Sequence, residues 1–182
     1  MAGYSLWLLP QADDAVVLTP VMRTLAVLFD HPPFDPHLTV QGNLGGDPRQ
    51  LATLAARVAG ETGALTWALP PVFGRAPFYY RALFLRFAEL SAFDALGDLV
   101  GSQTGTTEGR TPYPHLSLAY GAADRAPGSA DLVDAVETAH PGLLDEFQSR
   151  YFRFDRLAVA LSAQGVPLDQ WSILETFELR SG

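Results

Sequence analysis

Two short strings in this chain place residues capable of acid–base chemistry in nearly the same context. PHLTV covers Pro36–Val40, and PHLSL covers Pro114–Leu118. Each contains a His with Pro before it, Leu after it and a hydroxyl residue two positions on. Both strings are apolar enough to form strands, in which side chains two residues apart point to the same face. We therefore expect each string to present an imidazole and a hydroxyl on one surface.

Two such surfaces facing each other would suit a small anion. Imidazoles act as general acids and bases, and hydroxyl groups donate hydrogen bonds to phosphate oxygens. The sequence therefore predicts catalytic roles for His37, Thr39, His115 and Ser117. For an isolated His or Thr, an ordinary place in a sheet is the better interpretation. The matched contexts of the two strings favour catalysis.

Other segments resemble parts of a known superfamily. They are YSLWLLP near the N-terminus, the aromatic string FYYRALFLRF, and a C-terminal strand containing Trp171. Together with FDPHLTV and TPYPHLSLAY, they resemble the two-histidine (2H) phosphoesterases, which carry a duplicated His-x-Thr/Ser-x motif. The cyclic phosphodiesterase branch known from plants and yeast is the most similar. This resemblance implies an α+β, LigT-like fold of two lobes, with antiparallel sheets around a central groove and helices outside.

The resemblance also implies a substrate-binding role for several aromatic residues. Tyr80 and Tyr120 align with aromatic residues that line the substrate groove in the plant enzymes. Phe34, Trp7 and Tyr113 are further candidates for stacking on a nucleobase. Packing in the core is the alternative for all five residues. The second motif is one residue tighter than the plant pattern, which leaves the position of Tyr113 open.

The activity implied is metal-independent hydrolysis of a cyclic phosphodiester. The substrates would be nucleoside 2′,3′-cyclic phosphates, opened to 2′-phosphates, and ADP-ribose 1″,2″-cyclic phosphate. One neutral His would take a proton from water while the other, protonated, donates to the leaving oxygen, as a pair with pKa values of about 6–7 can do. Which His is the base stays open. The alternatives are an RNA-end 2′–5′ ligase-type phosphodiesterase and a nucleotide-binding module without turnover.

The composition indicates which classes of binding partner are disfavoured. The 182 residues include 12 basic and 20 acidic side chains, for a net charge of −8, and every basic residue is Arg. This charge disfavours extended contact with DNA or RNA. The chain has no Cys, and no apolar run approaches the ~20 residues of a membrane span. We expect a cytoplasmic monomer acting on a small cyclic phosphate or nucleotide, without metal, cofactor or membrane. His31 and His140, each followed by Pro, are expected on the surface.

The elements that must position these residues follow from local patterns. Helices are expected from Thr19–Pro20 to about Phe29, from Asp47–Pro48 onward, over Ser91–Val100 and over Ser129–Ala139, with a loop at Gly101–Arg110. Strands are expected at Tyr4–Leu9, His37–Leu44, Ala64–Phe73, Phe78–Ala88, His115–Tyr120, Tyr151–Ser162 and Trp171–Leu179. The order strand–helix–motif strand–helix–strand occurs twice. It predicts one domain built from two duplicated halves, at about residues 1–75 and 76–182.

Overall fold

A computed structural model describes residues 3–67, 69–74, 79–121, 134, 136–163 and 165–180. Within them, eight strands form one sheet with antiparallel pairing, in the order β3-β7-β1-β2-β6-β5-β4, and β8 pairs with β7. The strands are β1 (Tyr4–Pro10), β2 (Leu38–Leu44), β3 (Leu65–Thr66), β4 (Val72–Gly74), β5 (Leu83–Arg86), β6 (His115–Ala119), β7 (Arg153–Leu161) and β8 (Ser172–Glu178).

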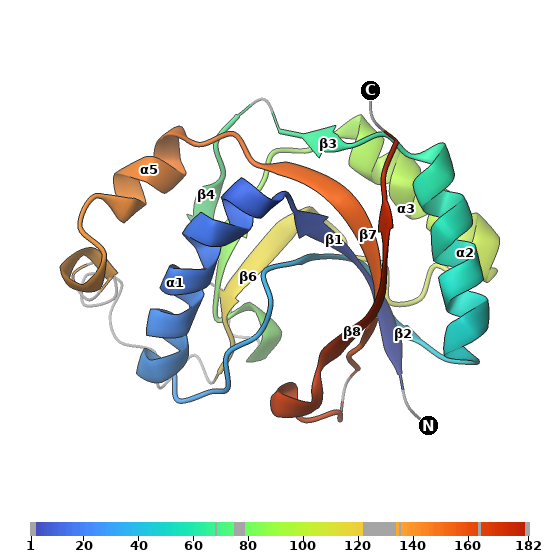
Figure 1. Cartoon of the computed structure of the whole chain (residues 1–182), viewed down its shortest axis with the longest axis horizontal. Helices are drawn as coiled ribbons and strands as arrows, with labels where there is room; N and C mark the ends of the chain where they lie inside the picture. The colour runs from blue at the N-terminus through green and yellow to red at the C-terminus, as the bar shows by residue number, and fades with distance from the viewer. Residues whose placement is uncertain are drawn as a thin grey trace.

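Helices lie on the outside of this sheet. They are α1 (Ala12–Leu28), α2 (Pro48–Glu61), α3 (Ser91–Thr104) and α5 (Leu143–Ser149). Figure 1 shows α1 and α5 toward one end of the molecule and α2 with α3 at the other. The predicted α+β fold, with antiparallel strands and helices outside, is confirmed. No helix among the described residues is both long enough and apolar enough to cross a membrane.

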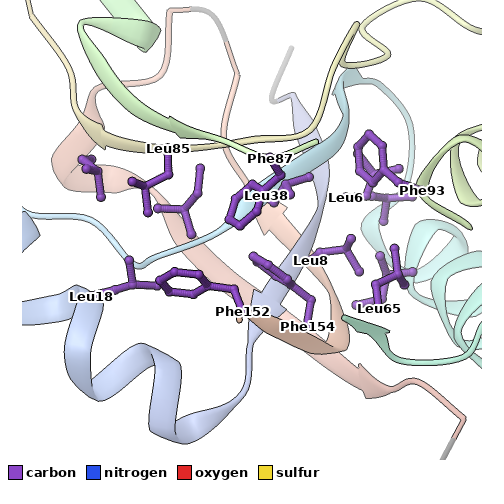
Figure 2. Packing of buried hydrophobic residues seen from close by; sticks show 14 of the residues in the cluster. Leu6, Leu8, Leu18, Leu38, Leu65, Leu85, Phe87, Phe93, Phe152 and Phe154 are labelled. Atoms are coloured by element: carbon purple, nitrogen blue, oxygen red, sulfur yellow. The ribbon is translucent and has the colours of Figure 1, made fainter. Parts of the chain in front are cut away.

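Strand alternation divides the side chains between two faces of the sheet. Leu6 and Leu8 of β1, Leu38 of β2 and Leu116 of β6 are fully buried in the main hydrophobic core. Helices α1, α2 and α3 pack on this core, and Figure 2 shows Leu18 of α1 beside Phe152. The intervening positions, including Trp7, therefore project from the other face. That second face carries the motif side chains.

Two predicted segments are wrong at their starts. Helix α1 begins at Ala12, not at Thr19–Pro20, and Pro20 lies inside it. The buried Asp14 carboxylate accepts hydrogen bonds from Arg150 Nε at 2.6 Å and from the Arg153 backbone N–H at 2.8 Å, which fixes the first turn. The predicted strand Phe78–Ala88 instead begins, within the described residues, as a 3₁₀ turn at Tyr79–Arg81, followed by β5.

The predicted strand Ala64–Phe73 is two short strands at opposite ends of the sheet. β3 pairs with β7, whereas β4 pairs with β5. Pro70 and Pro71 separate them, and Pro supplies no backbone N–H to a ladder. Helix α3 runs four residues beyond the predicted end and stops at Gly105, whose φ of 71° is left-handed.

The other predicted elements are found close to their expected positions. α2 begins as predicted, with the Asp47 side chain accepting from the Arg49 N–H. α5 was not predicted, and residues 129–133 and 135 of the predicted fourth helix lie outside the described residues. β7 lies between β3 and β1, so strands from both halves of the sequence interleave in the sheet. The duplication of two halves stays a prediction.

Candidate active site

The two motifs meet where β2 and β6 pair. Leu38 lies opposite Leu116 in antiparallel register. These two leucines point into the core, so the side chains on either side of each point to the opposite face. His37 and Thr39 of the first motif thus share one face with the imidazole and hydroxyl of the second. Antiparallel pairing relates the two motifs by a local two-fold axis.

A cavity of about 430 Å³ opens on this face of the sheet. Six of the residues predicted from the sequence line it: Trp7, Thr39, Tyr80, His115, Ser117 and Tyr120. His37, Phe34 and Tyr113 do not line it. The structure therefore brings one complete motif and half of the other to the cavity surface. His37 lies next to the cavity, because its ring stacks on Trp7, which lines it.

The two histidines are held in the same way. His37 Nδ1 lies 2.7 Å from the Asp35 carbonyl oxygen, and His115 Nδ1 lies 3.0 Å from the Tyr113 carbonyl oxygen. A carbonyl only accepts, so Nδ1 carries the proton in both rings and Nε2 is left as the basic nitrogen. Each carbonyl belongs to the residue before the motif Pro. Since the residue before Pro favours extended backbone, the repeated Pro-His step helps to set this geometry.

His37 is enclosed by aromatic rings. Its side chain is 3 % exposed. Its imidazole stacks on the Trp7 indole, with ring centroids 3.6 Å apart and planes 13° apart. The ring centroids of Phe34 and Trp171 lie 6.0 and 6.3 Å from that of His37. The pKa of His37 is lowered to about 4, mainly by burial. The hydrogen bond to the Asp35 carbonyl raises this pKa, and the nearby His115 lowers it further. The imidazole is therefore neutral at pH 7. The expectation that the first motif presents its imidazole on a surface is wrong, because aromatic rings cover His37.

His115 is half-buried and reaches the cavity. Burial lowers its pKa, the hydrogen bond to the Tyr113 carbonyl raises it, and the positive charge of Arg81 lowers it further. Both imidazoles therefore favour the neutral form in the free protein. The value of about 4 for His37 differs from the expected pair near pKa 6–7, and its main cause is desolvation.

The two motif hydroxyls differ in their surroundings. Ser117 Oγ donates to the Tyr80 carbonyl at 2.8 Å and also shares a side-chain hydrogen bond with Tyr120. A serine hydroxyl has a single proton, so Ser117 has none left for a ligand while it contacts Tyr80. Thr39 lines the cavity and is half-buried. Thr39 is therefore the better-placed donor in this conformation.

The aromatic residues form a wall beside the motifs. The Tyr120 and Phe34 rings stack at 4.2 Å, and Tyr80 stacks on Trp171 at 5.9 Å. Tyr80 is 38 % exposed, whereas Tyr120 is buried. Burial raises the pKa of Tyr120 well above its usual range, so its phenol stays protonated. Tyr80 and Trp171 are thus the rings most open to a ligand.

Tyr113 serves the second motif from outside the cavity. Its hydroxyl accepts from Arg81 Nη1 at 3.0 Å, and the Arg86 guanidinium lies 4.7 Å from its ring centroid. Arg81 itself lines the cavity. Arg110 also lines the cavity, and it forms an ion pair with Asp98 of α3.

Several lining residues were not predicted from the sequence. Ser5, Asn43, Thr111, Ser162 and Trp171 belong to segments far apart along the chain and meet only in the folded sheet. Of these, Ser5, Thr111 and Trp171 belong to segments that resemble the 2H enzymes, and that resemblance is the signal that could have found them. Within the described part of the chain, no group of three or more His, Cys, Asp or Glu side chains is arranged to hold a metal ion.

Comparison with known proteins places the fold. No protein-family model and no curated protein sequence matches the chain. Solved structures do. A phosphoesterase crystal structure superposes with a TM-score of 0.59 at 16% identity, covering 98% of this chain and 99% of the other. Escherichia coli LigT in complex with phosphate superposes with a TM-score of 0.58 at 16% identity, and the match covers 98% of this chain and 97% of LigT.

This chain has the LigT fold. The protein TT0787 of Thermus thermophilus also matches, with a TM-score of 0.58 at 16% identity and 98% coverage of both chains. The LigT-like fold that the resemblance implied is therefore confirmed. The match to LigT over nearly the full length of both chains agrees with the span of the motifs along the sequence.

Proposed function

We propose that this chain is a metal-independent phosphodiesterase that opens small cyclic phosphates with two histidines as acid and base. The observation that carries the proposal is the convergence of two Pro-His-x-Thr/Ser motifs about the Leu38–Leu116 pair, with Nδ1 of each imidazole held by a backbone carbonyl. The LigT fold supports it, since LigT has been crystallised with phosphate and with 3′-AMP.

The reaction needs two proton transfers and one displacement. A water oxygen forms a bond to phosphorus while the bond from phosphorus to one ring oxygen breaks. One neutral imidazole takes the proton that the water loses, and the other, as imidazolium, donates a proton to the departing oxygen. Thr39, from the cavity wall, donates to a non-bridging oxygen and stabilises the charge that develops there.

The substrate itself supplies the charge that the acid requires. Both imidazoles have lowered pKa values in the free protein. A phosphate anion about 4 Å away, at an effective dielectric constant of about 20, favours the imidazolium by roughly 4 kcal/mol, or about 3 pKa units. That interaction is large enough to restore one protonated histidine near neutral pH. Binding of the anion therefore prepares the site for catalysis.

His37 must also become accessible. Trp7 is a buried residue of β1, whereas Trp171, just before β8, is half-buried and borders the cavity. Displacement of Trp171 by the substrate's base or sugar would bring the phosphate toward His37 Nε2. In this proposal Tyr80, which stacks on Trp171, provides the alternative stacking surface for the base.

The substrate class that we propose is nucleoside 2′,3′-cyclic phosphates, opened to 2′-phosphates, together with ADP-ribose 1″,2″-cyclic phosphate. The test is turnover of a panel of these compounds in the presence of EDTA, followed by ³¹P NMR. Ring opening without added metal is expected. Binding without turnover would favour a nucleotide-binding module, and dependence on added metal would contradict the two-histidine mechanism.

A further inference from the structure

A third histidine, His31, joins the two motif segments. It follows α1 and begins the stretch that leads to the first motif. His31 Nδ1 lies 2.7 Å from the Pro32 carbonyl oxygen, so this nitrogen carries the proton and donates it. His31 Nε2 lies 3.2 Å from the Tyr120 backbone nitrogen and accepts its N–H. His31 was expected on the surface; it lines a surface hollow but is half-buried and hydrogen-bonded through both ring nitrogens.

The bond to Tyr120 replaces a missing strand partner. Tyr120 is one residue beyond β6, whose last ladder position is Ala119 opposite Leu83 of β5. On the side of β2, the pairing involves Leu116 alone. A backbone N–H at the end of a strand needs an acceptor, and here the imidazole provides it. His31 thus fixes the end of the second motif strand.

Ring contacts extend the same connection. The His31 ring lies 5.6 Å from the Phe34 ring and 6.2 Å from the Tyr120 ring, and these two rings stack on each other. The Tyr120 side chain in turn is hydrogen-bonded to Ser117 of the second motif. A continuous path of contacts therefore runs from the lead of the first motif through His31 and Tyr120 to Ser117.

Only the neutral form of His31 fits this arrangement. In the imidazolium both nitrogens carry protons, and Nε2–H would face the Tyr120 N–H, donor against donor. The charged groups beside the ring are Arg23 and Asp30, which line the same surface hollow and have opposite signs. Beyond the end of β6, the ring faces Tyr120, whose phenol is neutral. Burial also lowers the pKa of His31, which agrees with the geometry.

We propose that His31 is a positioning residue that bridges the two motif segments and holds Tyr120, and through it Ser117, in place for substrate binding. Its effect on catalysis rests on the function proposed above. The bridge itself does not, because it is defined by two hydrogen bonds of the free protein. Protonation of His31 breaks the bridge on the Tyr120 side.

The test uses a matched pair of substitutions and two independent measurements. In His31→Gln the side-chain oxygen can reach the former Nε2 position and accept the Tyr120 N–H. In His31→Asn the shorter amide can contact the Pro32 carbonyl but not Tyr120. With 2′,3′-cyclic AMP as substrate, we expect His31→Asn to raise KM by about tenfold, the scale of one lost hydrogen bond, with a smaller change in kcat. We expect His31→Gln to stay within about twofold of the wild type.

The second measurement does not need turnover. In ¹⁵N NMR spectra of the free wild-type protein, the Tyr120 amide is expected to shift with the titration of the His31 ring and to lose this response in both variants. An amide that ignores the His31 titration would overturn the bridge. Equal losses of activity in both variants would overturn the positioning role. If the wild type turns over no cyclic phosphate, the proposed function fails, and the amide titration still decides whether the bridge exists.

Discussion

The indole of Trp7 stacks on the imidazole of His37 with ring centroids 3.6 Å apart. This contact makes His37 part of an aromatic cluster and removes it from water. The cluster therefore tunes one of the two motif histidines, while His115, at the cavity surface, keeps access to a ligand. The two motifs match in sequence and in their backbone hydrogen bonds, but they differ in exposure. The pH dependence and the reactivity of the two histidines are expected to reflect that difference.

Stability is predicted to depend on His37 between pH 4 and 6.5. The folded-state pKa of about 4 lies below the ordinary value of 6.5. The unfolded chain therefore binds more protons in this range, so stability is fully present above pH 6.5 and falls as the pH drops toward 4. The expected loss is about 3 kcal/mol for this group. Urea unfolding of the wild type and of His37→Phe, whose ring stacks but does not titrate, measures it. Parallel pH curves for the two proteins would contradict the prediction.

Removing either motif imidazole is predicted to lower kcat by at least ~10²-fold, the scale of a lost general acid or base. His37→Asn and His115→Asn are suitable because the amide nitrogen can still donate to the Asp35 or Tyr113 carbonyl while Nε2 is gone. Steady-state turnover of 2′,3′-cyclic AMP measures the effect. His140→Asn is the matched control, since the hydrogen bond of His140 is to Thr24 of α1, away from the cavity. Near-normal turnover in either motif variant would rule out the two-histidine mechanism.

The pH profile of kcat/KM is predicted to be a bell with its maximum below pH 6.5. One imidazole must be charged and the other neutral, and burial lowers the pKa of both in the free enzyme. The two apparent pKa values belong to the pair. The profile of kcat reports the substrate complex, in which the phosphate anion favours the imidazolium, so its maximum is expected at higher pH. A rate that keeps rising through pH 9 in both profiles would indicate direct attack by hydroxide.

Thr39 is predicted to matter more than Ser117 for the rate. Ser117 commits its proton to the Tyr80 carbonyl, whereas Thr39 lines the cavity. Thr39→Val keeps the shape of the side chain and removes the donor, and a loss of roughly 10²-fold in kcat is expected for a lost oxyanion donor. For Ser117→Ala, the expected fold-loss in kcat is less than a tenth of that for Thr39→Val. Equal losses in the two variants would show that Ser117 turns from Tyr80 to the ligand when substrate binds.

The sequence predicted those parts of the site that depend on neighbouring residues. Alternation in the two motif strands placed His115 and Ser117 on one face, and the repeated string implied that the two strands would meet. The start of α1 could not be predicted in this way. Asp14, which anchors the first turn, accepts a hydrogen bond from Arg150, 136 positions away in the sequence. The local Thr19–Pro20 pattern contains no information about that contact.

The environment of each histidine also depended on distant contacts. His37 is buried because Trp7, from β1, and Trp171, from the segment before β8, converge on it. His31 lacks the hydroxyl two residues on that marks the motif histidines, and its partner Tyr120 follows it by 89 positions. No local spacing rule connects such residues. Their roles follow from contacts between segments that are distant in sequence, which only the tertiary structure reveals.

The last prediction concerns the size of the substrate. The net charge of −8 gives weak attraction for a polynucleotide backbone. Near the cavity, Arg110 is paired with Asp98 and Arg81 contacts Tyr113, so these cations are already engaged with protein groups. The cavity of about 430 Å³ and the ring of Tyr80 suit one base and sugar. We therefore expect a higher kcat/KM for 2′,3′-cyclic AMP than for a short RNA ending in the same cyclic phosphate, measured at physiological salt. Tyr80→Ala should reduce the preference, because the mononucleotide loses its stacking surface. A clear advantage for the RNA that weakens steeply with added salt would instead identify an enzyme that processes RNA ends.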